Sequence, residues 1–84
     1  MEIELKLFMF FKKFGPPDQV DGRSRMQLAP GTRFIDILNT INMPVEEDKI
    51  IVINGISHKQ GDEVNELEIK DGDTVAIFPP IAGG

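Results

Sequence analysis

Alternating apolar and polar residues open the chain and predict a β-strand over residues 2–11. A strand places every second residue on one face, so this segment has one apolar face, made of Ile3, Leu5, Leu7, Met9 and Phe11. The opposite face begins with charged residues, yet it also carries the aromatic rings of Phe8 and Phe10. Those two rings are covered by a loop or a neighbouring strand, or they form a surface for a partner protein.

The next segments predict a loop, a second strand and one helix. Residues 12–22 contain two prolines and two glycines, which favour a loop, and residues 23–28 follow as a strand. Pro30-Gly31 then turns the chain, and Thr32 is the predicted N-cap of a helix. Its apolar residues follow helical spacing and would form one buried stripe: Phe34, Ile37, Leu38 and Ile41. The helix is expected to stop at residues 42–44.

The second half of the chain predicts further strands joined by tight turns. Residues 49–53 are apolar and β-branched, as in a strand that is buried on both faces. Asn54-Gly55 is the strongest hairpin signal of the chain. Residues 56–70 fit a short strand or a helical turn, with Leu67 and Ile69 as apolar anchors. Asp71-Gly72 predicts a turn before the last strand, residues 74–78.

This order of elements predicts an α+β fold, a β-grasp roll in which one main helix covers one face of a mixed sheet. We expect residues 1–80 to form this domain and residues 81–84 to form a flexible diglycine tail. The helix leaves one sheet face open. If the odd-numbered residues of the first strand face the helix, Phe8 and Phe10 lie on that open face. Phe78 is their neighbour if the last strand pairs with the first.

Composition narrows the chemistry that this domain can perform. The 84 residues suit a single small domain, and the absence of cysteine excludes disulfides, thiolate metal sites and a cysteine nucleophile. One histidine cannot build a multi-histidine metal site. The formal net charge of -5 argues against nucleic acid as a partner and would favour a basic protein surface.

The pattern of apolar residues also bears on location. No run approaches the roughly 20 apolar residues of a membrane helix. The first residues lack the basic start and long apolar stretch of a signal peptide. We therefore expect a soluble cytoplasmic protein without a membrane partner.

The sequence ends in Gly83-Gly84, after Pro79-Pro80. Two glycines form the thinnest peptide that a chain can offer, and a carboxylate at Gly84 would be the only chemically active group at the tip. Such an end can enter the active site of another protein. The alternative is an inert tail of small residues, which is common at chain ends.

The last fourteen residues, DGDTVAIFPPIAGG, resemble the C-terminus of the small, sulfur-carrying subunit of molybdopterin synthase, a MoaD/ThiS-type ubiquitin-like protein. The Val52-Ile53-Asn54-Gly55 turn and Pro30-Gly31-Thr32 before the helix also match that family, so the resemblance extends from about residue 28 to the end. Relatives often place a short helix after the first strand. Here Gly15-Pro16-Pro17 predicts a loop instead.

The resemblance implies a function that lies in the C-terminal residue. The resemblance implies that a ubiquitin-activating-type adenylyltransferase uses ATP to activate the carboxylate of Gly84. A persulfide-carrying desulfurase would then supply the sulfur of a thiocarboxylate. The tail then inserts into the large synthase subunit, where sulfur passes to a pterin precursor in a complex of two small and two large subunits. The inserting residues would be Pro79, Pro80, Ile81, Ala82 and Gly83. The chain itself would bind no cofactor and catalyse nothing alone.

The aromatic residues Phe8, Phe10 and Phe78 are the candidate docking patch for these partners, because aromatic side chains are common interface anchors. Other functions remain open. The chain could be a protein modifier joined to lysines through Gly84, a sulfur carrier for thiamine synthesis or tRNA thiolation, or an interaction module with an inert tail. A self-contained enzyme has the least support, since no nucleophile–base pair, P-loop or metal cluster is visible in the sequence.

Overall fold

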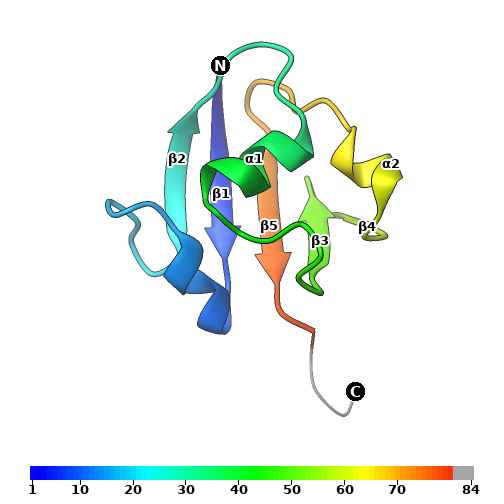
Figure 1. The fold of residues 1–84 in the computed structure, drawn as a ribbon. Helices are drawn as coiled ribbons and strands as arrows, with labels where there is room; N and C mark the ends of the chain where they lie inside the picture. Colours follow the sequence, from blue (N-terminus) through cyan, green and yellow to red (C-terminus); the bar gives the residue numbers. More distant parts are fainter. Residues whose placement is uncertain (81–84) are drawn as a thin grey trace.

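The computed structural model describes residues 1–80, which form one mixed sheet with a helix lying across one face (Figure 1). The sheet order is β2-β1-β5-β3-β4, and only the central β1–β5 pair is parallel. In chain order the elements are β1 (Glu2–Leu7), η1 (Met9–Phe14), β2 (Arg23–Gln27), α1 (Phe34–Thr40), β3 (Ile50–Ile53), β4 (Ile56–His58), α2 (Asp62–Asn65) and β5 (Thr74–Phe78). This arrangement confirms the predicted α+β roll of β-grasp type.

The core lies between α1 and one face of the sheet. The alternation in β1 has the expected effect, because Leu5 and Leu7 are buried and pair in register with Val75 and Ile77 of β5. Phe34, Ile37 and Leu38 complete the core from the helix side. None of the helices within residues 1–80 is long and apolar enough to cross a membrane.

The prediction that β3 is buried on both faces is wrong. Ile51 and Ile53 are buried, whereas Ile50 is 41% exposed and Val52 is only partly covered. The helix covers a single face of the sheet, so the other face of β3 stays accessible. The β-branched residues of this strand therefore reflect strand propensity as well as burial.

The first strand is shorter than its alternating pattern predicts. It ends at Leu7, and Met9 has a φ of 54°, which turns the backbone into the 3-10 helix η1. Met9 is consequently 65% exposed rather than buried, while Phe11 reaches the core from η1. The neighbouring strand β5 ends at Phe78, so residues beyond Phe8 have no strand on that side to pair with.

The 3-10 helix also corrects the prediction of a loop over residues 12–22. The loop begins only at Gly15, after the last residue of η1. A short helical segment therefore does follow the first strand, as in the relatives that the sequence resembles. The signal from Gly15-Pro16-Pro17 marks the end of this segment rather than its absence.

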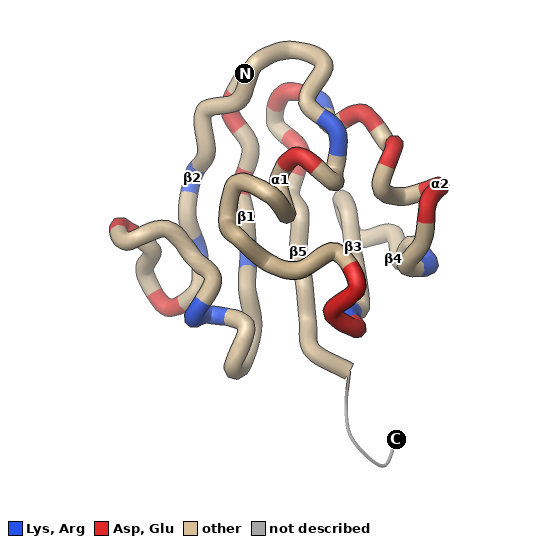
Figure 2. The backbone as a smooth tube through the Cα atoms, viewed as in Figure 1, with Lys and Arg blue, Asp and Glu red and all other residues tan. Residues whose placement is uncertain are grey.

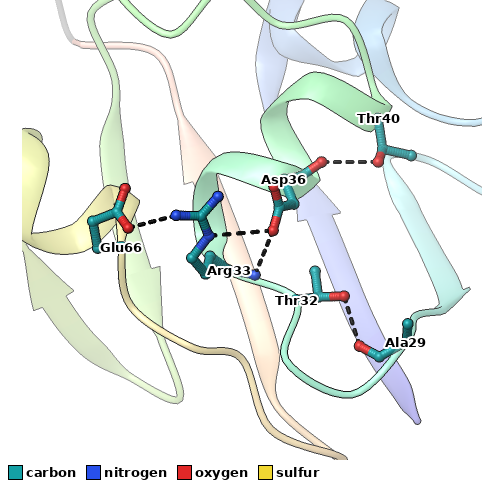
Figure 3. A network of polar contacts seen from close by, with 6 residues as sticks. All are labelled: Ala29, Thr32, Arg33, Asp36, Thr40 and Glu66. Atoms are coloured by element: carbon teal, nitrogen blue, oxygen red, sulfur yellow. Dashed lines mark hydrogen bonds and ion pairs between the residues drawn. The ribbon is translucent and has the colours of Figure 1, made fainter.

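The helix α1 begins one residue later than predicted (Figure 3). Arg33, not Thr32, is the N-cap, and its backbone N–H donates to Asp36 Oδ2 at 2.9 Å. This hydrogen bond lowers the pKa of Asp36, with the charge of Arg33 adding to the effect. The Thr32 hydroxyl instead donates to the Ala29 carbonyl at 2.6 Å. Arg33 also pairs with Glu66 at 2.5 Å, which joins α1 to the segment after α2.

Hydrogen bonds join the turn at Asn54-Gly55 to the turn that precedes β5. Asn54 and Gly55 have φ values of 53° and 80°, and they close the β3–β4 hairpin as predicted. The Asn54 side chain donates to Asp73 Oδ1 at 2.8 Å and accepts from the Thr74 N–H at 2.9 Å. The asparagine-glycine turn thus holds the start of β5, which follows the predicted turn at Asp71-Gly72.

Residues 56–70, for which the sequence allowed a short strand or a helical turn, contain both. It begins with strand β4 and continues with the one-turn helix α2. Of the two predicted anchors, Ile69 is buried, whereas Leu67 is 37% exposed. The role assigned to Leu67 is therefore wrong, and Val64 of α2 fills the core instead.

Candidate functional site

Two of the three candidate aromatic residues meet at the end of the central strand pair. Leu7 lies opposite Ile77, and both point into the core, so Phe78 falls on the open face of the sheet. The ring of Phe8 stacks on that of Phe78 with centroids 4.1 Å apart and planes 10° from parallel. Both residues are partly exposed. We call these two side chains the aromatic pair.

Ile50 extends the apolar surface of the aromatic pair. It lies opposite Phe78 in the antiparallel β3–β5 register, and it is 41% exposed. Ile50 is not among the residues predicted from the sequence to bind a partner, because residues 49–53 were expected to be covered on both faces. An apolar residue opposite Phe78 could have been found only once the strand order was known.

Phe10 does not belong to the aromatic pair, because it lies in the 3-10 helix η1 and not on the sheet. It belongs to η1, where its ring packs edge-on against Phe11 at a centroid distance of 5.1 Å. It is 58% exposed, more than either member of the aromatic pair. The expectation that Phe10 lies on the open sheet face is wrong, because the chain leaves the sheet before it reaches this residue.

Charged residues occupy much of the open face along β1 and β2 (Figure 2). Arg25 of β2 lies beside β1 and forms an ion pair with Glu2 at 3.1 Å. Lys6 and Glu4 of β1 are both partly exposed, and their charged atoms are 3.9 Å apart. The apolar surface around the aromatic pair is therefore bordered by charges along the sheet.

The chain leaves the sheet directly after the aromatic pair. Pro79 is buried and Pro80 is exposed, so Pro79 still belongs to the packed domain. The remaining residues that were assigned to the tail, Ile81, Ala82, Gly83 and Gly84, lie outside the described residues. Their proposed part in sulfur chemistry stays a prediction from the sequence.

Opposite charges flank the point where β5 ends. Figure 2 shows basic residues on η1 at one side of this end of the molecule and an acidic run just before β3 at the other. The basic residues are Lys12 and Lys13, and the acidic run consists of residues 46–48. Lys12 is paired with Asp21 at 2.6 Å, and this contact lowers the pKa of Asp21.

The acidic run is held in place by a buried lysine that sequence reasoning did not single out. Lys49 is 6% exposed, and its ammonium donates to the backbone carbonyls of Pro44, Val45 and Glu47. The Gln60 amide donates to two of the same carbonyls, at 3.2 and 3.0 Å. Burial lowers the pKa of Lys49, while the acidic run next to it acts in the opposite direction. A lysine placed directly before an apolar strand was the signal in the sequence.

Replacing Lys49 by methionine is expected to destabilise the domain by about 1–3 kcal/mol, because backbone carbonyls in a partly buried loop lose their donor. Methionine keeps the length of the side chain but offers no N–H. Urea unfolding followed by far-UV circular dichroism measures the difference. Lys70→Met is the control, because the Lys70 side chain is 69% exposed and is expected to tolerate the change. Equal stability of the Lys49 variant and the wild type would contradict a structural role.

Within residues 1–80, no group of three histidine, cysteine, aspartate or glutamate side chains could hold a metal ion. A half-open pocket of about 470 Å³ lies between β4 and α2, lined by residues 58–64 and Leu67. Strand β3 separates it from β5, because β4 is the edge strand of the sheet.

Known proteins resemble this chain in sequence family and in fold. The model of the ThiS family matches residues 13–84. None of the curated proteins matches the sequence of the chain. Among solved structures, the putative molybdopterin converting factor subunit 1 of Pyrococcus furiosus is 25% identical, with a TM-score of 0.66 and coverage of 95% of this chain and 98% of that protein.

Two further structures share the fold over the full length of both chains. One is SAMP1 of Haloferax volcanii, which is 21% identical with a TM-score of 0.66 and complete coverage of each chain, 100% and 100%. The other is the complex of subunits 1 and 2 of the molybdopterin-converting factor of Helicobacter pylori, 23% identical with a TM-score of 0.56 and coverage of 100% of each chain. Both similarities establish the fold alone.

Proposed function

The chain belongs to the ThiS family, and on this basis we propose that it is a cytoplasmic sulfur carrier whose Gly84 is converted to a thiocarboxylate. The observation that carries the proposal is the extent of the family match, which runs from residue 13 through the final glycine. We further propose that the sulfur is used to build molybdopterin and that the chain is the small subunit of molybdopterin synthase. The similarity to the Pyrococcus furiosus protein supports this recipient.

The chemistry at Gly84 needs activation, because a carboxylate would have to expel oxide. An adenylyltransferase of the ubiquitin-activating type transfers AMP from ATP to the carboxylate and releases pyrophosphate. The terminal sulfur of a desulfurase persulfide then attacks the acyl carbon and expels AMP. A thiol cleaves the resulting acyl disulfide, and a thiocarboxylate remains on Gly84. Acid–base groups for these steps come from the partner enzymes, as in other systems where the protein carries the reacting group.

The aromatic pair is the proposed docking patch for these partners. Phe8 and Phe78 stack on the open sheet face, and Ile50 widens the apolar surface beside them. Pro79 and Pro80 restrict the backbone where the chain leaves the patch, so less conformational entropy is lost when a partner takes up the following residues. A partner bound to the patch would therefore meet the C-terminal residues in a limited range of directions.

The direct test is the intact mass of the protein after incubation with an activating enzyme, ATP and a persulfide sulfur donor. A sulfur carrier gains the mass difference between one sulfur and one oxygen atom, and the gain disappears when ATP is omitted. The mass of the C-terminal peptide then assigns the change to Gly84. An unchanged mass under conditions that load a known carrier would refute the proposal.

A protein modifier would use the same activated glycine, and SAMP1 of Haloferax volcanii shares the fold. The two functions differ in their products. A modifier forms an amide bond between Gly84 and a lysine of another protein, which appears as bands of higher mass in the source cell. A carrier leaves only the thiocarboxylate and the sulfur-containing product of its partner.

Phe78→Ala is expected to weaken binding of the large synthase subunit more than it lowers the melting temperature. Phe78 is partly exposed and sits at the end of β5, whereas Ile77 beside it is fully buried. Titration calorimetry measures the affinity, and circular dichroism measures the melting temperature. Ile77→Ala is the control and should show the reverse pattern, with a large loss of stability. A Phe78 variant that melts early but binds normally would assign Phe78 to the core.

A further inference from the structure

The 3-10 helix η1 presents two large apolar side chains to solvent. Met9 is 65% exposed and Phe10 is 58% exposed, although the next residue, Phe11, is completely buried. Exposed apolar side chains that lie next to one another at a chain reversal often mark an interaction surface. We call Met9, Phe10 and Lys13 the η1 knob.

The backbone at Met9 is held in an unfavourable conformation. Its φ of 54° lies in the left-handed region, which a residue with a side chain adopts only at a cost in free energy. Within residues 1–80, the other three non-glycine residues with a positive φ are asparagine or aspartate, which tolerate this region better. A strained methionine that gains no burial points to a function for its exposed side chain.

Lys13 places a positive charge over the rings of the η1 segment. Its Nζ lies 5.8 Å from the centroid of Phe10 and 5.2 Å from that of Phe14. Within residues 1–80, none of the ion pairs involves Lys13, whereas Lys12 is paired with Asp21. The η1 knob therefore combines an apolar tip with a cation that has no carboxylate partner in the described part of the chain.

The η1 knob follows one member of the aromatic pair directly along the chain. Phe8, one member of the pair, is the residue that precedes η1, and its N–H donates to the Ile77 carbonyl at 3.3 Å. The acidic residues 46–48 lie on the other side of the end of β5 (Figure 2). A protein that covers the aromatic pair and takes up the C-terminal residues will thus meet a cation on one side and carboxylates on the other.

We propose that the η1 knob is a second docking element for the large subunit of the synthase. Met9 and Phe10 would fill an apolar recess of that subunit, a carboxylate at its rim would face Lys13, and basic residues would face the acidic run at 46–48. This inference rests on the proposed function. The exposed apolar side chains of the η1 knob favour the large subunit over the activating enzyme as the partner, because lasting subunit interfaces are more apolar than transient ones.

The charges and the apolar residues have separate roles in this interface. The apolar tip contributes to affinity, since methionine adapts to irregular recesses and phenylalanine is a common anchor. The opposite charges on the two sides of the end of β5 admit only one orientation of the partner, because the reversed orientation brings like charges together. Orientation decides in which direction the C-terminal residues enter the large subunit.

Met9→Gly tests the proposal, because binding is expected to weaken without any loss of stability. Glycine adopts a φ of 54° without strain, so the melting temperature should stay the same or rise. Binding of the purified large subunit, measured by titration calorimetry, should weaken several-fold, and adding Phe10→Ser should bring the loss to about tenfold or more. Val20→Ser is the control, since Val20 is 75% exposed but lies in the loop before β2.

Lys13→Glu tests the charge at the rim. It is expected to slow association with the large subunit and to reduce the effect of salt on the association rate, whereas Lys59→Glu, beside β4, should change neither. Normal affinity of the Met9→Gly, Phe10→Ser variant, together with weakened binding by Phe78→Ala, would overturn the inference and leave the proposed function standing. A wild-type chain that takes up sulfur but does not bind the large subunit would overturn the docking inference and the molybdopterin role together. Failure to take up sulfur would instead refute the carrier function itself.

Discussion

Adding one alanine after Gly84 is expected to abolish thiocarboxylate formation while leaving the fold intact. The added residue moves the carboxylate away from the diglycine and places a Cβ where a narrow active site admits only the backbone. Gly84→Val should have the same effect, because its branched side chain adds bulk at the residue that carries the reacting carboxylate. Both variants should show no gain of sulfur in the intact mass under conditions that fully load the wild type.

Gly84→Ala provides a graded control for this experiment, because it adds a single methyl group and keeps the terminus in place. It should load slowly rather than not at all. Circular dichroism should give all three variants the melting temperature of the wild type, since the core cluster of the described residues is formed by side chains from Ile3 to Ile77. Normal thiocarboxylate formation by the extended variant would refute the proposed chemistry.

Gly22→Ala is expected to destabilise the domain by about 3 kcal/mol or more, a large fraction of the stability of a small domain. Gly22 is buried with a φ of 84°, and its carbonyl accepts a hydrogen bond from the Leu7 N–H at 2.8 Å. A Cβ at this position would lie 2.1 Å from the Leu7 carbonyl oxygen. That oxygen belongs to the end of β1, so the clash cannot be relieved without moving the strand.

Gly72→Ala separates the effect of the close approach from that of the backbone conformation. Gly72 has a φ of 85°, almost the same as that of Gly22, but an added Cβ would meet nothing within 4 Å. Its replacement should cost only the strain of the left-handed conformation, about 1 kcal/mol. Urea unfolding followed by circular dichroism measures both variants. Equal losses for the two would show that the Leu7 carbonyl yields easily and that conformation alone requires glycine at position 22.

A substitution at Gly22 that shifts the end of β1 would also displace the proposed docking surface. Leu7 and Gly22 fix the end of β1, and the aromatic pair and the η1 knob follow directly from that point. A Gly22 variant that still folds is therefore expected to bind the large subunit less tightly than Gly72→Ala does. This link explains why a glycine far from the C-terminus matters for a function proposed to reside there.

Local sequence patterns predicted the parts of the structure that depend on neighbours along the chain. The alternation of Ile3, Leu5 and Leu7 predicted the buried face of β1, because period two is a property of any strand. The helical spacing of Phe34, Ile37 and Leu38 predicted the stripe that α1 buries. Asn54-Gly55 predicted its turn through its backbone conformation alone. The family was visible in the C-terminal run, since several residue types recur there at fixed spacing from the final glycine.

The tertiary structure alone decided the features that depend on residues distant in sequence. The alternation continues to Phe11, but β1 stops at Leu7, and only the position of β5 shows that pairing ends there. The same early stop separates Phe10 from the aromatic pair and exposes Met9. Burial of Lys49 depends on carbonyls that a folded loop collects around its ammonium. Local patterns state which residues can share a face, whereas the pairing of distant strands decides which faces are covered and where each strand ends.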